Sequence, residues 1–374
     1  MALSPLNQRR WRNFRRNGRA FWSLVIFATL FFLSLFAELI ANDKPLVVQY
    51  RGDYYFPVFQ YYSEETFGSD LNKPTVYYDP FTICLVKTGG LLDDCLDDPE
   101  SIVADRSDTR VAEVDGQPVK PGWMIWPVIP FSYSTIAYDM PQSVALTPPS
   151  VAHWLGTDSQ KRDVMARVIY GFRTSVLFAL IVTACASVIG IAAGAVQGYF
   201  GGRVDLFMQR LLEIWSSTPS LYVIIILFAI LGRSFWLLVF VTVLFGWPAL
   251  VGVVRAEFLR ARNFEYVRAA RALGVSNRVI MFRHILPNAM VATLTMLPFV
   301  VTGAISGLAA LDYLGYGLPA SAPSLGELAL QGKQNLQAPW LGFTAFFTFA
   351  LMLSLLVFIF EGIRDAFDPR KTFA

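Results

Sequence analysis

The chain has 374 residues, of which 55% are hydrophobic and only 16% are charged. Roughly a quarter of the residues in soluble globular domains are charged, so this composition excludes an ordinary soluble domain and indicates a membrane protein. The formal net charge of +3 is, on the topology below, the sum of a basic inner face and an acidic outer face, and we expect no nucleic-acid partner.

Six apolar runs are long enough to cross a bilayer, whose hydrocarbon core of about 30 Å needs about 20 helical residues. They are residues 20–41, 175–200, 206–231, 235–254, 289–311 and 340–360. The third run is the least regular, because Arg210 and Glu213 lie in its first turns. The pattern predicts an all-α integral membrane protein with six transmembrane helices.

The charges that flank these runs predict the topology. Six arginines precede the first run: Arg9, Arg10, Arg12, Arg15, Arg16 and Arg19. Such a flank before a long apolar run favours a signal anchor with residues 1–19 in the cytoplasm over a cleaved signal peptide. Residues 255–288 carry seven arginines and two glutamates. With six spans, this loop and the C-terminal tail also fall in the cytoplasm.

Residues 42–171 differ in composition, with many prolines and tyrosines and acidic runs such as "DDCLDDPE". The topology places this insertion outside the cytoplasm, ahead of the other five predicted spans in residues 172–374. Cysteines outside the cytoplasm tend to oxidise, so we expect a disulfide between Cys84 and Cys95. The alternative is two free thiols in a loosely structured insertion.

The residues that catalysis would need are missing, so we expect no enzymatic activity, no catalytic residue and no metal site. The two histidines, His153 and His284, fall on opposite sides of the membrane in this topology. Gly326 lies one residue too far from Gly332-Lys333 for a phosphate-binding loop. The stretch "GYGLPA" matches a dinucleotide fingerprint, but it follows a membrane helix rather than a strand.

Small and polar residues distinguish two of the predicted spans. Gly190, Gly194 and Gly198 recur every four residues, which predicts close helix packing between spans or subunits, with a pore lining as the alternative. Pro219 follows Ser216, Ser217 and Thr218. It predicts a kink, either beside a translocation path or as a plain structural bend, with the hydroxyls bonding the freed carbonyls.

The loop after the fourth span contains "EYVRAARALGVSNRVIMFRHILPN". A first helix is expected to end at Gly274, and a second helix, with Ser276 as its N-cap, is expected to stop at Pro287. Phe264, Val267 and Leu273, beside the paired alanines Ala269 and Ala270, suggest an apolar face that fits a groove on another protein. A basic helix lying on anionic lipid is the alternative.

This loop resembles the cytoplasmic EAA loop of permease subunits of dipeptide and oligopeptide ATP-binding-cassette importers. The matching residues are Glu265, Tyr266, Ala269, Ala270, Gly274, Leu286 and Pro287, whereas Arg268 stands where the family has a glutamate. The stretch "WLGTDSQKRDVMARVIYGFRTS" resembles another motif of the group, through Gly156, Thr157, Asp158, Arg162, Asp163 and Arg167, with Lys161 in place of a glycine. The stretches "GYFGGRVDLFMQR", "LDYLGYGLPASAPSLGELA" and "EGIRDAFDPR" extend the resemblance over residues 154–370.

The stretch "AELIANDKPL" and the long insertion further resemble the subgroup of peptide permeases used for microcin C uptake. The resemblance implies a type I importer permease with a periplasmic insertion after the first helix, in the bacterial inner membrane. The resemblance also implies that the chain forms half of a peptide pathway, together with a second homologous permease. The implied partners are two ATPase subunits, or one fused ATPase, which bind ATP and Mg²⁺, and a periplasmic peptide-binding protein; membrane lipid surrounds the spans. Glu265, Tyr266, Arg268, Ala269, Ala270, Gly274 and Pro287 are the implied coupling residues.

Two other functions remain open from the residues alone. A membrane-anchored receptor or structural protein needs only the first span and the outer domain, and it leaves five glycine-rich spans without a role. An ion-coupled secondary transporter needs buried acids or inverted repeats, and neither is evident in the spans.

Overall fold

The computed structural model describes residues 5–105, 110–114, 117–137 and 146–367. The chain divides into two compact units, one formed by Met1–Phe32 with Gly171–Ala374 and the other by Leu33–Tyr170. The second unit begins earlier than the expected insertion at residue 42. The reason is that Ala37 and Ala41 are fully buried in a cluster with Ile129, Ala166 and Tyr170, all residues of that unit.

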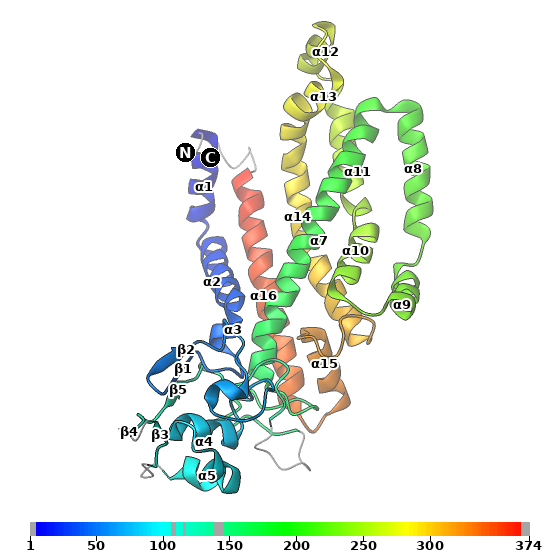
Figure 1. Cartoon of the computed structure of the whole chain (residues 1–374). Helices are drawn as coiled ribbons and strands as arrows, with labels where there is room; N and C mark the ends of the chain where they lie inside the picture. The colour runs from blue at the N-terminus through cyan, green and yellow to red at the C-terminus, as the bar shows by residue number, and fades with distance from the viewer. Residues whose placement is uncertain (1–4, 106–109, 115–116, 138–145, 368–374) are drawn as a thin grey trace. The chain divides into compact units, whose positions relative to one another are not determined.

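The first unit is helical and includes the predicted spans (Figure 1). Its helices are α1 (Pro5–Arg16), α2 (Gly18–Leu35, whose last residues belong to the second unit), α7 (Val164–Phe200, whose first residues do), α8 (Gly202–Ser217), α9 (Ser220–Leu231), α10 (Phe235–Gly246), α11 (Pro248–Ala261), α12 (Glu265–Ala272), α13 (Asn277–Val279), α14 (Leu286–Tyr313), α15 (Leu325–Gln334) and α16 (Pro339–Phe367), with a π-helical turn η2 (Ile280–Ile285) before α14.

Five described helices are long and apolar enough to cross a membrane, and α8 with α9 makes a sixth span if the bent pair is counted as one. This agrees with the six predicted runs. The irregular third run corresponds to the bent pair, in which the helix axis turns by 66° at Thr218 and Pro219. The first predicted span is shorter than expected, since α2 ends at Leu35 and a separate turn, α3 (Ala37–Ile40), follows.

The second unit is a small α+β domain. Its elements after α3 are β1 (Val47–Tyr50), β2 (Asp53–Tyr55), the 3₁₀ turn η1 (Glu64–Phe67), α4 (Pro80–Thr88), α5 (Leu92–Asp97), α6 (Pro99–Ala104), β3 (Glu113–Val114), β4 (Gln117–Pro118) and β5 (Trp123–Ile125). The strands β2, β1 and β5 form an antiparallel sheet in that order, with Val48 opposite Tyr55 and Met124. Edge-to-face aromatic pairs around Phe67 build its core.

A disulfide joins Cys84 in α4 to Cys95 in α5, and both cysteines are fully buried beside Leu85 and Ile102. The bond closes a short loop, since only 11 positions separate the two cysteines in the sequence. Asp79 caps α4 by accepting a hydrogen bond from the Phe81 amide. The described part of the insertion therefore forms a folded domain that contains its own disulfide.

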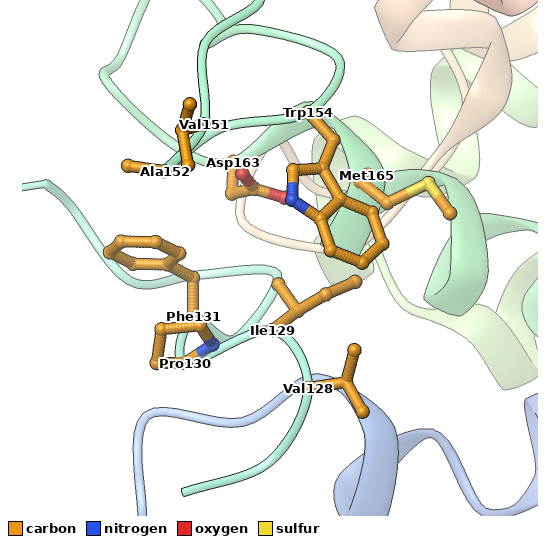
Figure 2. A pocket seen from close by; sticks show the side chains of 9 residues that line it. All are labelled: Val128, Ile129, Pro130, Phe131, Val151, Ala152, Trp154, Asp163 and Met165. Carbon is orange, nitrogen blue, oxygen red and sulfur yellow. The ribbon is translucent and has the colours of Figure 1, made fainter.

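The charged motif before α7 is buried in the second unit. Arg162 donates to Asp158 at 2.8 Å, and Asp163 accepts from the Ala166 amide at 2.8 Å and lies 2.7 Å from Nδ1 of His153. Beside these residues lies a pocket of about 190 Å³, whose lining includes Phe131, Trp154 and Met165 (Figure 2). Because buried charges are costly unless paired, this network holds the start of α7 in one geometry.

Candidate functional site

The loop between α11 and α14 is centred on α12, whose ends follow from its sequence. Phe264 is extended and precedes the helix, and Glu265 in the first turn interacts favourably with the helix dipole. At the other end, Gly274 has φ +75°, a conformation that side chains with a Cβ rarely adopt. The Val275 amide donates to the carbonyl of Ala270, which closes the helix as the glycine predicts.

The inner face of α12 packs against the chain's own spans. Val267 is fully buried and Ala270 is 9% exposed. Both belong to a cluster from α7, α11, η2 and α14 that is formed by Ala195, Tyr199, Val254, Phe258, Ala261, Ile280, Met281, Ile285 and Ala289. The prediction that Phe264, Val267 and Leu273 form one outward apolar face is wrong for Val267, which packs inward with Ala270. Six residues span about 600° of helical rotation, so Val267 and Leu273 point in different directions.

The outer face of α12 presents a different apolar set. Tyr266 is 42% exposed and Leu273 is 83% exposed, and Ala269 between them is also exposed. These residues follow the i, i+3, i+7 spacing of one helical face. The exposed side chains of Arg268 and Arg271 flank them. We call Tyr266, Ala269 and Leu273 the outer face of α12; with its arginines it is a small apolar surface with a cationic rim.

Polar contacts tie this loop to the end of α7. The Tyr199 hydroxyl donates to Oδ1 of Asn277 at 2.7 Å, and the Arg271 guanidinium lies 5.4 Å from the centre of the Tyr199 ring. Nearby, Arg255 of α11 makes two hydrogen bonds to Asp205 of α8, at 2.5 and 2.7 Å. A bidentate pair of this kind fixes orientation as well as distance. Side-chain contacts thus tie the loop to α7, and they tie α11, which precedes the loop, to α8.

The second half of the loop differs from the prediction. The helix that starts after Ser276 does not stop at Pro287, because α13, η2 and α14 run on without a break from Asn277 to Tyr313. Pro287 lies in the first turn of α14, directly after the π-helical turn η2. The π-helical turn before it absorbs the change in hydrogen bonding. Ser276 stands at the N-cap position, but its side chain makes no capping bond.

The three glycines of α7 lie against α11 and against Trp247, the residue that joins α10 to α11. A Cβ on Gly190 would meet the Trp247 carbonyl at 2.6 Å, one on Gly194 would meet Val254 Cβ at 2.8 Å, and one on Gly198 would meet Phe258 Cβ at 2.5 Å. The spacing therefore corresponds to a contact between two spans of the same chain, at the end that carries α12.

Pro219 breaks the third span rather than kinking it. The helix α8 ends before Thr218, which is extended, and α9 starts after Pro219. The hydroxyls of Ser217 and Thr218 donate to the carbonyl of Ile214 at 2.8 and 3.4 Å, as expected for hydroxyls beside a helix-breaking proline. No role in a translocation path follows from this geometry.

Sequence reasoning missed several residues that shape this site. Tyr199, Asp205 and Arg255 were not singled out, although Tyr199 and Asp205 lie within the quoted stretch "GYFGGRVDLFMQR". At the opposite end of α14, buried Asp312 accepts hydrogen bonds from the Leu318 amide at 2.7 Å and the Ser324 hydroxyl at 2.5 Å. The sequence signal for these two hydrogen bonds was an acidic residue at the end of an apolar helix, followed by a glycine-rich turn.

Comparisons with known proteins bear directly on this architecture. Residues 186–373 match the family described as the binding-protein-dependent transport system inner membrane component, and residues 4–62 match the N-terminal TM domain of oligopeptide transport permease C. The inner membrane ABC transporter permease protein YejE of Escherichia coli strain K12 is 52% identical over 369 residues, which cover 99% of this chain and 98% of that protein.

Two further relatives and one solved structure extend the comparison. The peptidoglycan transport system permease protein YejE of Agrobacterium fabrum is 50% identical, covering 99% of this chain and 95% of that protein. The oligopeptide transport system permease protein OppC of Bacillus subtilis strain 168 is 36% identical over 60% of this chain and 73% of its own length. A chain of the inward-facing MetNI methionine ABC transporter has a TM-score of 0.47 and 16% identity over 55% of this chain and 97% of that chain.

The residues that suggested an importer permease lie within these matches. The predicted resemblance and the helical, multi-span fold class are confirmed, although the second unit adds the strands β1–β5 to a chain expected to be all-α. The chain belongs to the family of binding-protein-dependent transport system inner membrane components, as a multi-pass permease subunit of an ABC transporter.

Proposed function

We propose that this permease pairs with a second homologous permease to form the translocation pathway of an ATP-driven peptide importer. The support for a peptide cargo comes from the names of its relatives, which refer to oligopeptide, dipeptide and peptidoglycan transport. Microcin C-like peptides are the narrower expectation. Competition by unlabelled peptides for uptake of a radiolabelled tripeptide, in cells that depend on this permease, tests the class. Uptake unaffected by a hundred-fold peptide excess would contradict it.

The outer face of α12 is the proposed contact with a cytoplasmic ATPase. The observation that supports this contact is an exposed leucine at the end of a helix whose opposite face packs against the spans. Leu273 is 83% exposed at the end of α12, while Val267 on the inner face is fully buried. A movement of a partner bound at this face would reach α7, α11 and α14 through the shared apolar cluster. A basic helix resting on anionic lipid is the competing explanation for the arginines.

The proposed orientation places α12 and both ends of the chain in the cytoplasm. Within the first unit, α14 leads away from the α12 end and α16 returns to it, where α1 packs on the last turns of α16 (Figure 1). Arginines are concentrated at this end, which the positive-inside rule assigns to the cytoplasm. The periplasmic binding protein would then dock on the opposite side, with the second unit as a candidate surface.

The decisive experiment is co-purification of the ATPase from native cells in mild detergent. Leu273→Asp places a charge in the proposed interface, and burial of a leucine is worth about 1.5–3 kcal/mol, so we expect at least a ten-fold loss of bound ATPase. Leu336→Asp is the matched control, because Leu336 is also 83% exposed but lies in the connection between α15 and α16, at the other end of the unit.

The outcomes separate the two explanations of the loop. If Leu273→Asp retains the ATPase as fully as Leu336→Asp does, α12 is not the coupling contact and lipid binding is favoured. Ala270 is unsuitable for this test because it is buried and its substitution would disturb the loop itself.

ATP and Mg²⁺ are proposed to bind to the partner ATPase, so vigorous ATP hydrolysis by this purified chain alone would contradict the proposal.

A further inference from the structure

A second surface of the first unit combines apolar walls with concentrated positive charge. A pocket of about 440 Å³ lies between α1, the first turns of α2 and the last turns of α16. Trp11, Phe14, Leu24, Ile363 and Phe367 form its apolar wall, and Arg10 is its charged member. Phe14 anchors this arrangement, since it is buried against Ala20 and Ala366.

The helix that carries the pocket is strongly basic. Arg9, Arg12, Arg15, Arg16 and Arg19 are all exposed along α1 and the start of α2. No acidic residue occurs between residues 5 and 37, and the last turns of α16 add Glu361 and Asp365 beside Arg364. Positive charge therefore predominates around the pocket, and an anionic occupant complements it.

The pocket is also suited to a molecule with a long apolar part. It lies beside the ends of two helices that are apolar enough to span a membrane, α2 and α16. Trp11 and Trp22 are 46% and 63% exposed at this end, which is typical of the aromatic belt at a membrane interface. The surface thus combines apolar side chains with guanidinium groups beside the ends of two apolar helices.

The geometry of Arg10 indicates how a headgroup would be held. Its guanidinium carbon lies 4.3 Å from the centre of the Phe367 ring. A guanidinium has five N–H donors in the plane of the group, and a forked set of donors of this kind suits a phosphodiester. The same ring contact brings the cation next to the apolar wall, so one molecule can contact both.

We propose that this pocket binds an anionic glycerophospholipid of the inner leaflet, with its phosphate at Arg10 and one acyl chain along Trp11, Phe14 and Leu24. Basic pockets beside transmembrane helices on the cytoplasmic side are suited to such headgroups. The site is separate from the outer face of α12 and from the peptide pathway, so it goes beyond the proposed function. Its occupant would fix α1 against α16 at the membrane surface.

The test uses the full-length chain in nanodiscs that contain phosphatidylcholine and one fifth phosphatidylglycerol. Bromine atoms on the acyl chains quench tryptophan, and the difference between the native chain and Trp11→Phe isolates Trp11 from the other eight tryptophans. At equal mole fraction, we expect brominated phosphatidylglycerol to associate with Trp11 about five-fold more strongly than brominated phosphatidylcholine, since an arginine near the surface contributes about 1 kcal/mol.

Two variants with the same change in charge make the test specific. Arg10→Gln should bring the preference close to one, whereas Arg278→Gln, which removes an exposed arginine from α13, should leave it five-fold. Equal quenching of the Trp11 difference signal by the two lipids overturns the proposal, as does an Arg10→Gln chain with native preference. Reversal of the quenching by millimolar inorganic phosphate or by an acidic peptide would instead identify a soluble anion or a protein segment as the ligand.

Discussion

At the scale of single residues, the glycines of α7 lie very close to the backbone of α11. At Gly198 a Cβ would lie 2.5 Å from the Arg255 carbonyl oxygen and from Phe258 Cβ, so even a methyl group requires the two helices to separate. This contact lies beside the bidentate pair of Arg255 and Asp205. Packing and ion pairing therefore act on the same junction of α7, α8 and α11.

This fit leads to a prediction for alanine substitutions. Gly198→Ala should lower the stability of the purified chain by about 1–3 kcal/mol, the usual cost of overpacking. Gly252→Ala is the control, because it lies in α11 with nothing within 4 Å of its would-be Cβ and gains helix propensity worth up to about 1 kcal/mol. Unfolding in a denaturing detergent measures both. Equal stability of the two variants would mean that the helices are not held at this distance.

At the scale of elements, α12 shows that hydrophobic spacing alone does not identify the partner of a helical face. Val267 and Leu273 are both apolar, yet one packs into the chain's own cluster and the other is 83% exposed. The turn between α4 and α5 in the second unit shows the opposite case. There, the predicted topology suggested an oxidising environment for the two cysteines, and the fold brings their Cα atoms to 5.7 Å.

The disulfide between α4 and α5 predicts how many cysteines can be alkylated, and mass spectrometry can count the labels. The chain has three cysteines, and Cys185 is free and exposed. Alkylation of the unfolded chain should therefore add one label without reductant and three labels after reduction. Cys84→Ser should add two labels without reductant, since Cys95 then has no partner. Removing the bond should also destabilise the second unit by about 3 kcal/mol, visible as faster proteolysis of the full chain. Three labels without reductant would show that no bond forms.

At the scale of the whole molecule, the first unit has two ends with different chemistry. One end carries α1, α12 and the last turns of α16, with most of the arginines (Figure 1). The other carries α15 and the buried Asp312 network. An even number of crossings, with the bent pair counted as one, returns the chain to the side on which it began.

The orientation of these ends is testable with two matched cysteines. In a Cys185→Ser background, Leu336→Cys should react with a membrane-impermeant maleimide in intact spheroplasts, and Leu273→Cys should react only after permeabilisation. Both positions are 83% exposed, so a difference in labelling reports the side of the membrane rather than burial. The background chain without an added cysteine is the blank. Labelling of Leu273→Cys in intact spheroplasts would reverse the proposed topology.

The sequence by itself determined the membrane class, the number of apolar runs and the family, because span length and motif residues are local properties of the chain. It also indicated the glycine contact face and the pairing of Cys84 with Cys95. Only the tertiary structure decided that Val267 and Ala270 face inward, that Pro287 lies inside a continuous helix, and that Pro219 divides the third span. Each of these depends on which neighbouring groups satisfy a side chain or a carbonyl, and those neighbours come from distant parts of the chain.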